Sequence, residues 1–309
     1  MTTLQARGAR TGAPPSTAPT RPARRAGWGG LLYIAPSLLV LTFIAIIPIV
    51  FSGYLSLTRY DVLSDPVFTG LDNYTRLLND PNFWGALRTT AIYTLIAVPL
   101  QMIIPMILAE FLARVAGPRF SSIVRSVLFV PVVASLILVG TVWQYMLAPD
   151  SGIFNVMLKA MGLSSVNFLG NPQLALICVA LVSVWKNIGY FLVLFYAGVQ
   201  DIPVEQYEAA RVDGAGGFKQ FLHITLPGLK PVTLLCTILA TIWSFQVFDL
   251  VYSMTGGGPG GATTTIVMGI YEAGFKSFQM GYASAIAMVL LVIVLIVSIV
   301  QRLAFREEH

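Results

Sequence analysis

Long apolar runs alternate with shorter polar connections along most of this 309-residue chain. A helix needs about 20 consecutive, mostly apolar residues to cross a bilayer, and six runs reach that length. They lie near residues 31–57, 86–113, 123–147, 173–199, 232–254 and 281–303. The pattern predicts an all-α polytopic membrane protein with six transmembrane helices.

The same pattern divides the chain into segments. We expect a disordered Arg-rich tail over 1–30, a first transmembrane helix over 31–57, an extracytoplasmic loop over 58–85, a core of five helices over 86–303 that includes a polar loop at 200–231, and a short C-terminal segment over 304–309.

The composition supports a membrane protein. Hydrophobic residues make up 56% of the chain and charged residues 11%, against about 25% charged in an ordinary soluble domain. Cys178 and Cys236 both lie in apolar runs, without the spacing of a metal or disulfide framework. A soluble globular protein is therefore excluded, and we expect no metal site.

The first 30 residues contain five arginines and no acidic residue. Such a segment cannot bury an apolar core, so we expect disorder. The apolar run that follows is too long for a signal peptide, and no small-residue cleavage site comes after it. We interpret it as the first transmembrane helix and not as a removed leader.

The basic residues indicate the orientation of the chain. Cytoplasmic segments of membrane proteins carry an excess of Lys and Arg. If the N-terminus is cytoplasmic, thirteen basic residues lie inside and five lie outside, the latter being Arg59, Arg76, Arg88, Lys159 and Lys276. We therefore expect both termini inside. The net charge of +5 then reflects topology, and we expect no nucleic-acid partner.

The loop at 200–231 contains EQYEAARVDGAGG at residues 205–217. Glu208 with Ala209 and Ala210 forms a small surface with one charge, which the backbone of another protein can approach closely. Gly214 and the glycines after it permit a sharp turn. We expect two short helices joined by a flexible elbow. The alternative is an amphipathic connector that rests on the lipid headgroups.

In this loop EAA (208–210) is followed after three residues by Gly214, and after nine more residues by ITLP (224–227). This spacing resembles the signature loop of permease subunits of binding-protein-dependent ABC importers. Other segments are similar to the sugar-type permeases, the maltose and glycerol-3-phosphate class. They are FTGLDNY (68–74), DSGIFNVMLKAMGL (150–163), FDLVYSMTGGGP (248–259) and GYASA (281–285).

The resemblance implies a coupling helix that docks on a separate ATPase subunit, with Glu208, Ala209, Ala210 and Gly214 transmitting ATPase closure to the spans. It also implies a distinct second permease subunit, two ATPase subunits, an extracytoplasmic solute-binding protein and a bacterial cell membrane. The chain has no G-x-x-x-x-G-K-[ST] loop. We therefore expect no enzyme activity and no cofactor in this chain, with ATP and Mg bound by the ATPase subunits.

Polar and aromatic residues in the fourth and fifth runs suit a sugar. Ser183, Asn187 and Tyr190 lie on one helical face by their spacing. In the fifth run, the resemblance to the maltose-type permease points to Trp243, Ser244 and Val247, with Gln246 beside them. Hydroxyl groups need hydrogen bonds, whereas the C–H face of a sugar stacks on an aromatic ring. The alternative is that these residues only pack neighbouring helices together.

Lys186 and Asp249 are the two charges within the apolar runs that need an explanation, since each costs about 2.5–3.5 kcal/mol at mid-bilayer. Their role stays open at this point. A neutral sugar is favoured over glycerol-3-phosphate or another polyol, because Lys186 is the single cation that the predicted cavity offers. An ion-coupled secondary transporter, with Lys186 and Asp249 as the relay, is the rival from another class.

Overall fold

The computed structural model describes residues 29–305. The chain divides into two units, Met1–Ile49 and Val50–His309, and each is described by itself. The predictions for the tail at 1–30 and for the C-terminal segment at 304–309 fall almost wholly outside the described residues.

The first unit is helical throughout its described part. α1 (Gly29–Leu41) runs into a π-helical turn, η1 (Thr42–Ile46), and then into α2 (Ile47–Leu55), which continues into the second unit. The Thr42 hydroxyl donates to the Leu38 carbonyl at 2.7 Å, so this polar group is satisfied within the helix. The segment Tyr33–Leu55 is long and apolar enough to cross a membrane.

Three long helices of the second unit also meet that criterion, namely α4 (Pro81–Arg114), α8 (Pro172–Gln200) and α15 (Met280–Ala304). The side chains of Asp80 and Asn171 begin α4 and α8 by accepting backbone N–H groups of the first turn, and a proline follows each. This is the expected chemistry of a helix start, because the first N–H groups have no partner within the helix.

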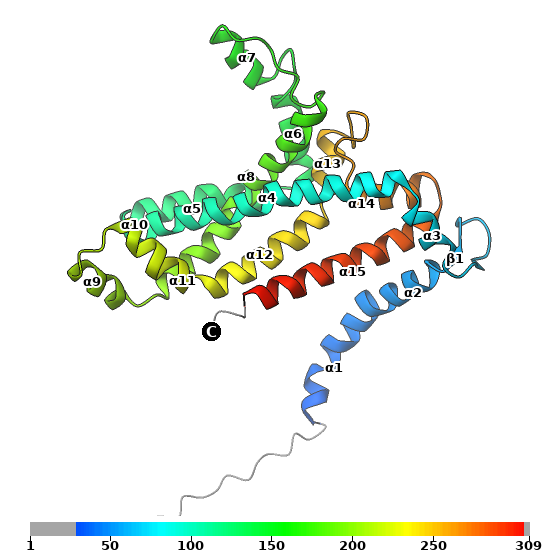
Figure 1. Cartoon of the computed structure of the whole chain (residues 1–309), viewed down its shortest axis with the longest axis horizontal. Coiled ribbons are helices and arrows are strands. Elements are labelled where there is room, and N and C mark those ends of the chain that lie inside the picture. The colour runs from blue at the N-terminus through cyan, green and yellow to red at the C-terminus, as the bar shows by residue number, and fades with distance from the viewer. Residues whose placement is uncertain (1–28, 306–309) are drawn as a thin grey trace, which may run out of the picture. The chain divides into compact units, whose positions relative to one another are not determined.

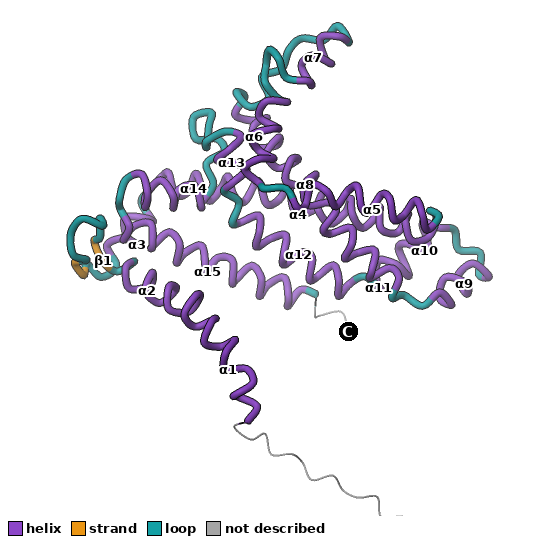
Figure 2. Tube along the Cα trace, turned by 180° about the vertical axis from the view of Figure 1, so that it is seen from behind, coloured by secondary structure: helices purple, strands orange, loops and turns teal. Residues whose placement is uncertain are grey.

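α4 and α8 lie side by side along much of their length (Figures 1 and 2). Ala109 of α4 and Phe191 and Phe195 of α8 are completely buried in their common core. Lipid tails are as apolar as these side chains, so close packing, more than removal from water, holds such helices together.

Two further membrane segments are bent. α5 (Pro118–Val133) and α6 (Leu136–Met146) meet at 99°, and the segment Gly217–Gly228 meets α12 (Lys230–Phe245) at 70°. Within the described residues, four helices are long enough to cross a membrane, or up to six segments if each bent pair is one span. The predicted fold class, a helical polytopic membrane protein, is confirmed, and the count of six spans stays a prediction.

The bends differ from the sequence expectation. The run 123–147 is not one straight helix, and the run 232–254 stops being helical after Phe245 and resumes as α13 (Asp249–Met254). Apolar character reports immersion in lipid and not the direction of the backbone, so the sequence pattern missed both breaks.

Short elements fill the connections. They are β1 (Thr58–Arg59), β2 (Val67–Phe68), α3 (Asp72–Leu78), α7 (Ile153–Ala160), α9 (Val204–Val212), α10 (Gly217–Gln220), η2 (Phe221–Thr225), α11 (Leu226–Gly228), α14 (Ile266–Tyr271) and η3 (Glu272–Lys276). β1 and β2 pair antiparallel, with Thr58 opposite Phe68. In Figure 1, α9 and α10 lie at one end of the second unit, and α3 and β1 lie at the other.

α8 approaches the backbone of α5 very closely at Gly189. A Cβ atom at this position would overlap the Leu128 carbonyl group. Glycine is therefore required here by space, and the close approach fixes α5 against α8.

Gly189→Ala is expected to lower the free energy of unfolding by about 1–3 kcal/mol, because the α5 backbone must move away. Gly85→Ala is the matched control, since Gly85 lies in α4 and a Cβ there meets nothing within 4 Å. Alanine favours a helix over glycine by about 1 kcal/mol, so the control should keep or raise the midpoint of thermal unfolding in detergent. An unchanged midpoint for Gly189→Ala would contradict the close approach.

Candidate functional site

A cavity of about 430 Å³ lies between α4, α8, the α5–α6 break and the α12–α13 break, and we call it the central cavity. Its lining residues are Tyr93, Gln101, Val132, Leu136, Ser183, Lys186, Asn187, Tyr190, Trp243, Ser244, Gln246, Val247, Phe248, Asp249 and Leu250. The structure thus brings together all seven residues that the sequence predicts as sugar contacts, from two segments about 60 residues apart. Their binding role stays a prediction.

The cavity wall combines aromatic surface with hydrogen-bonding groups. The ring centroids of Tyr190 and Trp243 lie 5.0 Å apart, and the buried ring of Phe191 packs behind them, with its centroid 5.7 Å from that of Trp243. Next to this cluster, the Gln101 amide donates to the Ser183 hydroxyl at 3.3 Å. An apolar face beside fixed polar groups is the usual composition of a site for a small, polar ligand.

Both helix breaks at the cavity leave a backbone carbonyl without its helical partner, and each carbonyl has another donor. Lys186 Nζ donates to the Val132 carbonyl at 3.2 Å, and the Thr265 hydroxyl donates to the Val247 carbonyl at 2.9 Å. An unpaired buried carbonyl costs about 1–3 kcal/mol. Irregular backbone at membrane depth is tolerated only where protein or a cavity replaces lipid, and these donors make both breaks possible.

The two intramembrane charges have separate local explanations. Lys186 supplies the donor at the α5–α6 break. Asp249 lies in the first turn of α13, where a negative charge favours the positive end of the helix dipole. No ion pair joins Lys186 and Asp249 within residues 29–305.

The predicted coupling residues lie on the surface of α9 and on the turn behind it. Glu208 and Ala209 are exposed and Ala210 is partly exposed. Gly214 follows with a φ of +78°, a backbone conformation that glycine adopts at little cost. The expected arrangement of two helical segments about a glycine elbow is therefore present, and its docking role stays a prediction.

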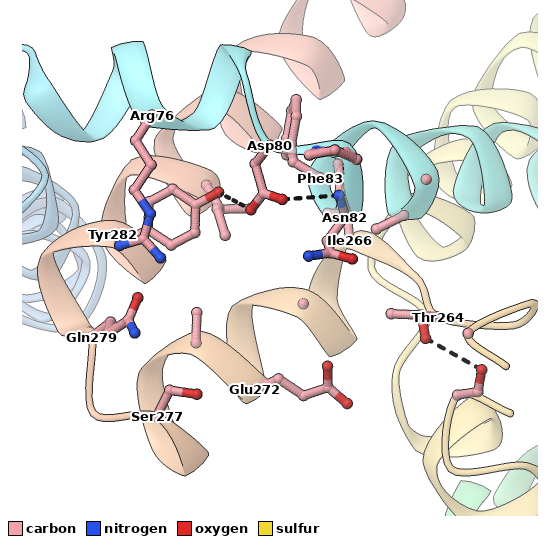
Figure 3. A pocket seen from close by; sticks show the side chains of 18 of the residues that line it. Arg76, Asp80, Asn82, Phe83, Thr264, Ile266, Glu272, Ser277, Gln279 and Tyr282 are labelled. Carbon is pink, nitrogen blue, oxygen red and sulfur yellow. Dashed lines mark hydrogen bonds between the residues drawn. The ribbon is translucent and has the colours of Figure 1, made fainter.

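A second pocket of about 700 Å³ lies where α4 and α15 begin, beside the glycine-rich turn at 256–261 (Figure 3). The Tyr282 hydroxyl donates to the Asp80 carboxylate, and the Arg76 guanidinium lies 4.1 Å from the Tyr282 ring centroid. Burial disfavours the charged carboxylate, but the bonds from Tyr282 and the Asn82 N–H, with the charge of Arg76, outweigh it and lower the pKa of Asp80. The charges of Arg76 and Asp80 are thus engaged in joining the two helix starts.

Comparison with known proteins identifies the family. Residues 81–307 match the family described as binding-protein-dependent transport system inner membrane component. The chain belongs to this family. The permease is 37% identical over 278 residues to the probable ABC transporter permease protein YurN of Bacillus subtilis, covering 89% of this chain and 95% of the relative.

Two other relatives are named as permeases of sugar transport systems. The trehalose/maltose transport system permease protein MalF of Thermococcus litoralis is 37% identical, with 88% of this chain and 91% of the relative covered. The lactose transport system permease protein LacF of Rhizobium radiobacter is 34% identical, with 90% and 94% covered.

A solved structure shows the same fold. It is the crystal structure of a bacterial ABC transporter involved in the import of the acidic polysaccharide alginate. It has a TM-score of 0.80 at 21% identity, with 91% of this chain and 96% of that chain covered.

Sequence reasoning missed the contribution of α4 to the central cavity. Tyr93 and Gln101 both line it and are each 1% exposed. The Gln101 Oε1 atom is buried and has no hydrogen-bond partner in the described part of the permease. The available signal was a glutamine in the middle of an apolar run, since polar residues within spans usually face a cavity or a neighbouring helix.

Lys186→Met is expected to lower the free energy of unfolding by about 1–3 kcal/mol, because the Val132 carbonyl loses its donor while the side-chain volume is kept. Lys159→Met is the matched control, since Lys159 also donates to a backbone carbonyl, that of Asp150 at 3.5 Å, but at an exposed site. Thermal unfolding of both variants in detergent measures the difference. Equal midpoints for the two variants would contradict the role of Lys186 at the break.

Proposed function

We propose that the permease is one of two transmembrane subunits of an ATP-driven importer that passes a mono- or oligosaccharide inward. The observation that carries the proposal is the central cavity, where the rings of Tyr190 and Trp243 stand beside Ser183, Asn187 and Ser244. Aromatic faces suit the C–H surface of a sugar, and the polar groups suit its hydroxyls. Relatives named for trehalose and maltose, lactose and arabinooligosaccharides support this cargo.

The partners follow from the same proposal. An extracytoplasmic binding protein delivers the sugar, a second and distinct permease subunit completes the pathway, and two ATPase subunits bind ATP and Mg. The permease family is binding-protein-dependent by its description. One solved relative of the same fold is a complex with an alginate pentasaccharide-bound periplasmic protein.

In the proposed orientation both termini are cytoplasmic, in agreement with the distribution of basic residues. α9 then faces the cytoplasm, with Glu208, Ala209, Ala210 and Gly214 against an ATPase subunit. The small side chains allow close approach, and the glycine elbow lets α9 tilt against the segment that leads into α12.

Two alternatives have less support. A phosphate-bearing substrate such as glycerol-3-phosphate needs an excess of cations, whereas the described lining of the cavity carries Lys186 and the opposite charge of Asp249. An ion relay needs Lys186 and Asp249 to exchange a proton, and no ion pair joins them in the described residues.

The cargo is tested with the complete complex in proteoliposomes, supplied with its binding protein and offered trehalose, maltose, lactose, arabinobiose and glycerol-3-phosphate. We expect ATP-dependent uptake of at least one sugar. Trp243→Ala should lower the maximal rate of uptake of that sugar by about tenfold, or about 1.4 kcal/mol, because the cavity acts after the binding protein has captured the sugar. Trp185→Ala is the matched control, because Trp185 is similarly exposed (39% against 38%) but does not line the cavity.

The cargo proposal fails if glycerol-3-phosphate alone is taken up. It also fails if uptake follows an ion gradient without ATP, which would favour the ion-coupled alternative. Equal maximal rates of uptake for the two tryptophan variants would remove the central cavity from the transport path.

The coupling role is tested with Glu208→Ala. We expect the sugar taken up per ATP hydrolysed to fall by about 5- to 150-fold, the usual range of a coupling free energy, while the complex still assembles. Glu205→Ala is the matched control, because Glu205 is an exposed acid on the same helix outside the EAA motif, and it should keep the parent ratio. If Glu208→Ala also keeps that ratio, the segment is a connector and not a coupling element.

A further inference from the structure

α9 buries one side chain against the rest of the permease. Within α9, which the structure describes in full, Tyr207 is the single buried residue, at 2% exposure. It directly precedes Glu208, whose side chain is exposed. The helix therefore presents its polar face outward and attaches to the bundle through the tyrosine.

The Tyr207 ring lies against the last turn of α4. The guanidinium carbon of Arg114 is 3.2 Å from the ring centroid, which is the geometry of a cation–π contact. α4 ends at Arg114. The contact therefore joins the proposed coupling helix to the end of a long membrane helix.

The Tyr207 hydroxyl extends the connection to the other half of the loop. It lies 2.9 Å from the Thr225 hydroxyl, and Thr225 is completely buried. Glu110 of α4 lies near Thr225. Either hydroxyl can be the donor of the Tyr207–Thr225 hydrogen bond, which joins α9 directly to η2.

Glu110 and Arg114 lie one helical turn apart on α4, and Glu110 Oε2 and Arg114 Nε are 3.9 Å apart. We call these four side chains (Tyr207, Thr225, Glu110 and Arg114) the Tyr207 clamp. The distance between Glu110 Oε2 and Arg114 Nε is too long for a hydrogen bond, and these two atoms have no hydrogen-bond partner among the described residues. Partly buried charges of this kind are costly compared with apolar side chains of similar size, so a purely structural anchor would not need them.

We infer that Tyr207 is a positioning residue that transfers movement of the coupling helix to α4. The clamp joins both halves of the loop, α9 and η2, to the end of one helix. Along α4, Gln101 lies thirteen residues before Arg114, or about 20 Å at 1.5 Å per residue, and it lines the central cavity. A displacement of α9 is thus passed to the cavity wall. This inference rests on the proposed function, since it specifies how the coupling loop acts.

The test compares Arg114→Met, Arg114→Lys, Tyr207→Leu and Tyr207→Phe in the complete complex in proteoliposomes. The probe is maltose, or whichever sugar of the panel above the parent complex takes up. The measured quantity is the sugar taken up per ATP hydrolysed, together with co-purification of the ATPase subunits. Arg119→Met is the matched control, because Arg119 is an exposed arginine in the first turn of α5, the helix that follows α4.

Arg114→Met and Tyr207→Leu should lower the uptake ratio by about 5- to 20-fold with the ATPase subunits still bound. Arg114→Lys should keep most of the parent uptake ratio, because a cation still lies over the Tyr207 ring. Tyr207→Phe, which keeps the ring and loses the hydroxyl, should fall between parent and Tyr207→Leu. The double variant of Arg114→Met and Tyr207→Leu should be no worse than the poorer single variant, since both remove one interaction.

The inference is overturned if Arg114→Met keeps the parent ratio, if it loses no more than Arg119→Met, or if the effects of the two single variants simply add. Should Tyr207→Leu fail to assemble, the Arg114→Met and Arg114→Lys pair decides the matter, because it leaves the tyrosine packing intact. Glu208→Ala distinguishes failure of the clamp from failure of the coupling role. If Glu208→Ala lowers the uptake ratio and the clamp variants do not, only the clamp is wrong. If none of these variants lowers the ratio, the coupling role itself is wrong.

Discussion

The rest of the structure depends on the requirement that every backbone polar group at membrane depth has a partner. A straight helix meets this requirement by itself, but α5–α6 and α12–α13 are broken. Each break therefore needs a donor from another part of the chain. Lys186 of α8 serves the Val132 carbonyl, and Thr265 serves the Val247 carbonyl. Lys186 and Thr265 are therefore polar side chains that the two breaks require and that a bundle of straight apolar helices would not need.

The two breaks also explain where the cavity lies. Val132 and Leu136 come from one break and Gln246, Val247 and Phe248 from the other, and all five line the central cavity. Interrupted helices expose backbone and redirect side chains, so they produce a polar, shaped wall that continuous helices would not. α4 completes this wall and runs unbroken to Arg114, where it meets the proposed coupling loop. The cavity and the proposed ATPase contact are in this way connected by one helix.

Part of this arrangement is readable from the sequence. The apolar length of α4, α8 and α15 predicts membrane helices, and Gly214 predicts the elbow, because few other residues tolerate its backbone angle. The seven cavity residues follow from polar positions at helical spacing together with the family resemblance. The 99° bend at Ala134 and Ser135 does not follow from the apolar pattern, and the donor to the Val132 carbonyl beside it is Lys186, 54 positions away. The glutamine at 101 was a signal within the apolar run of α4, whereas Tyr93 could not be found, because packing decides which face α4 turns to the cavity.

The most direct measurement is a cryo-electron microscopy structure of the complete complex, with its binding protein, imported sugar and a non-hydrolysable ATP analogue. We expect sugar density in the central cavity, against Tyr190 and Trp243, with the Lys186 and Thr265 contacts to the two breaks retained. Sugar bound elsewhere, or α5–α6 and α12–α13 straightened into continuous helices around it, would contradict the account.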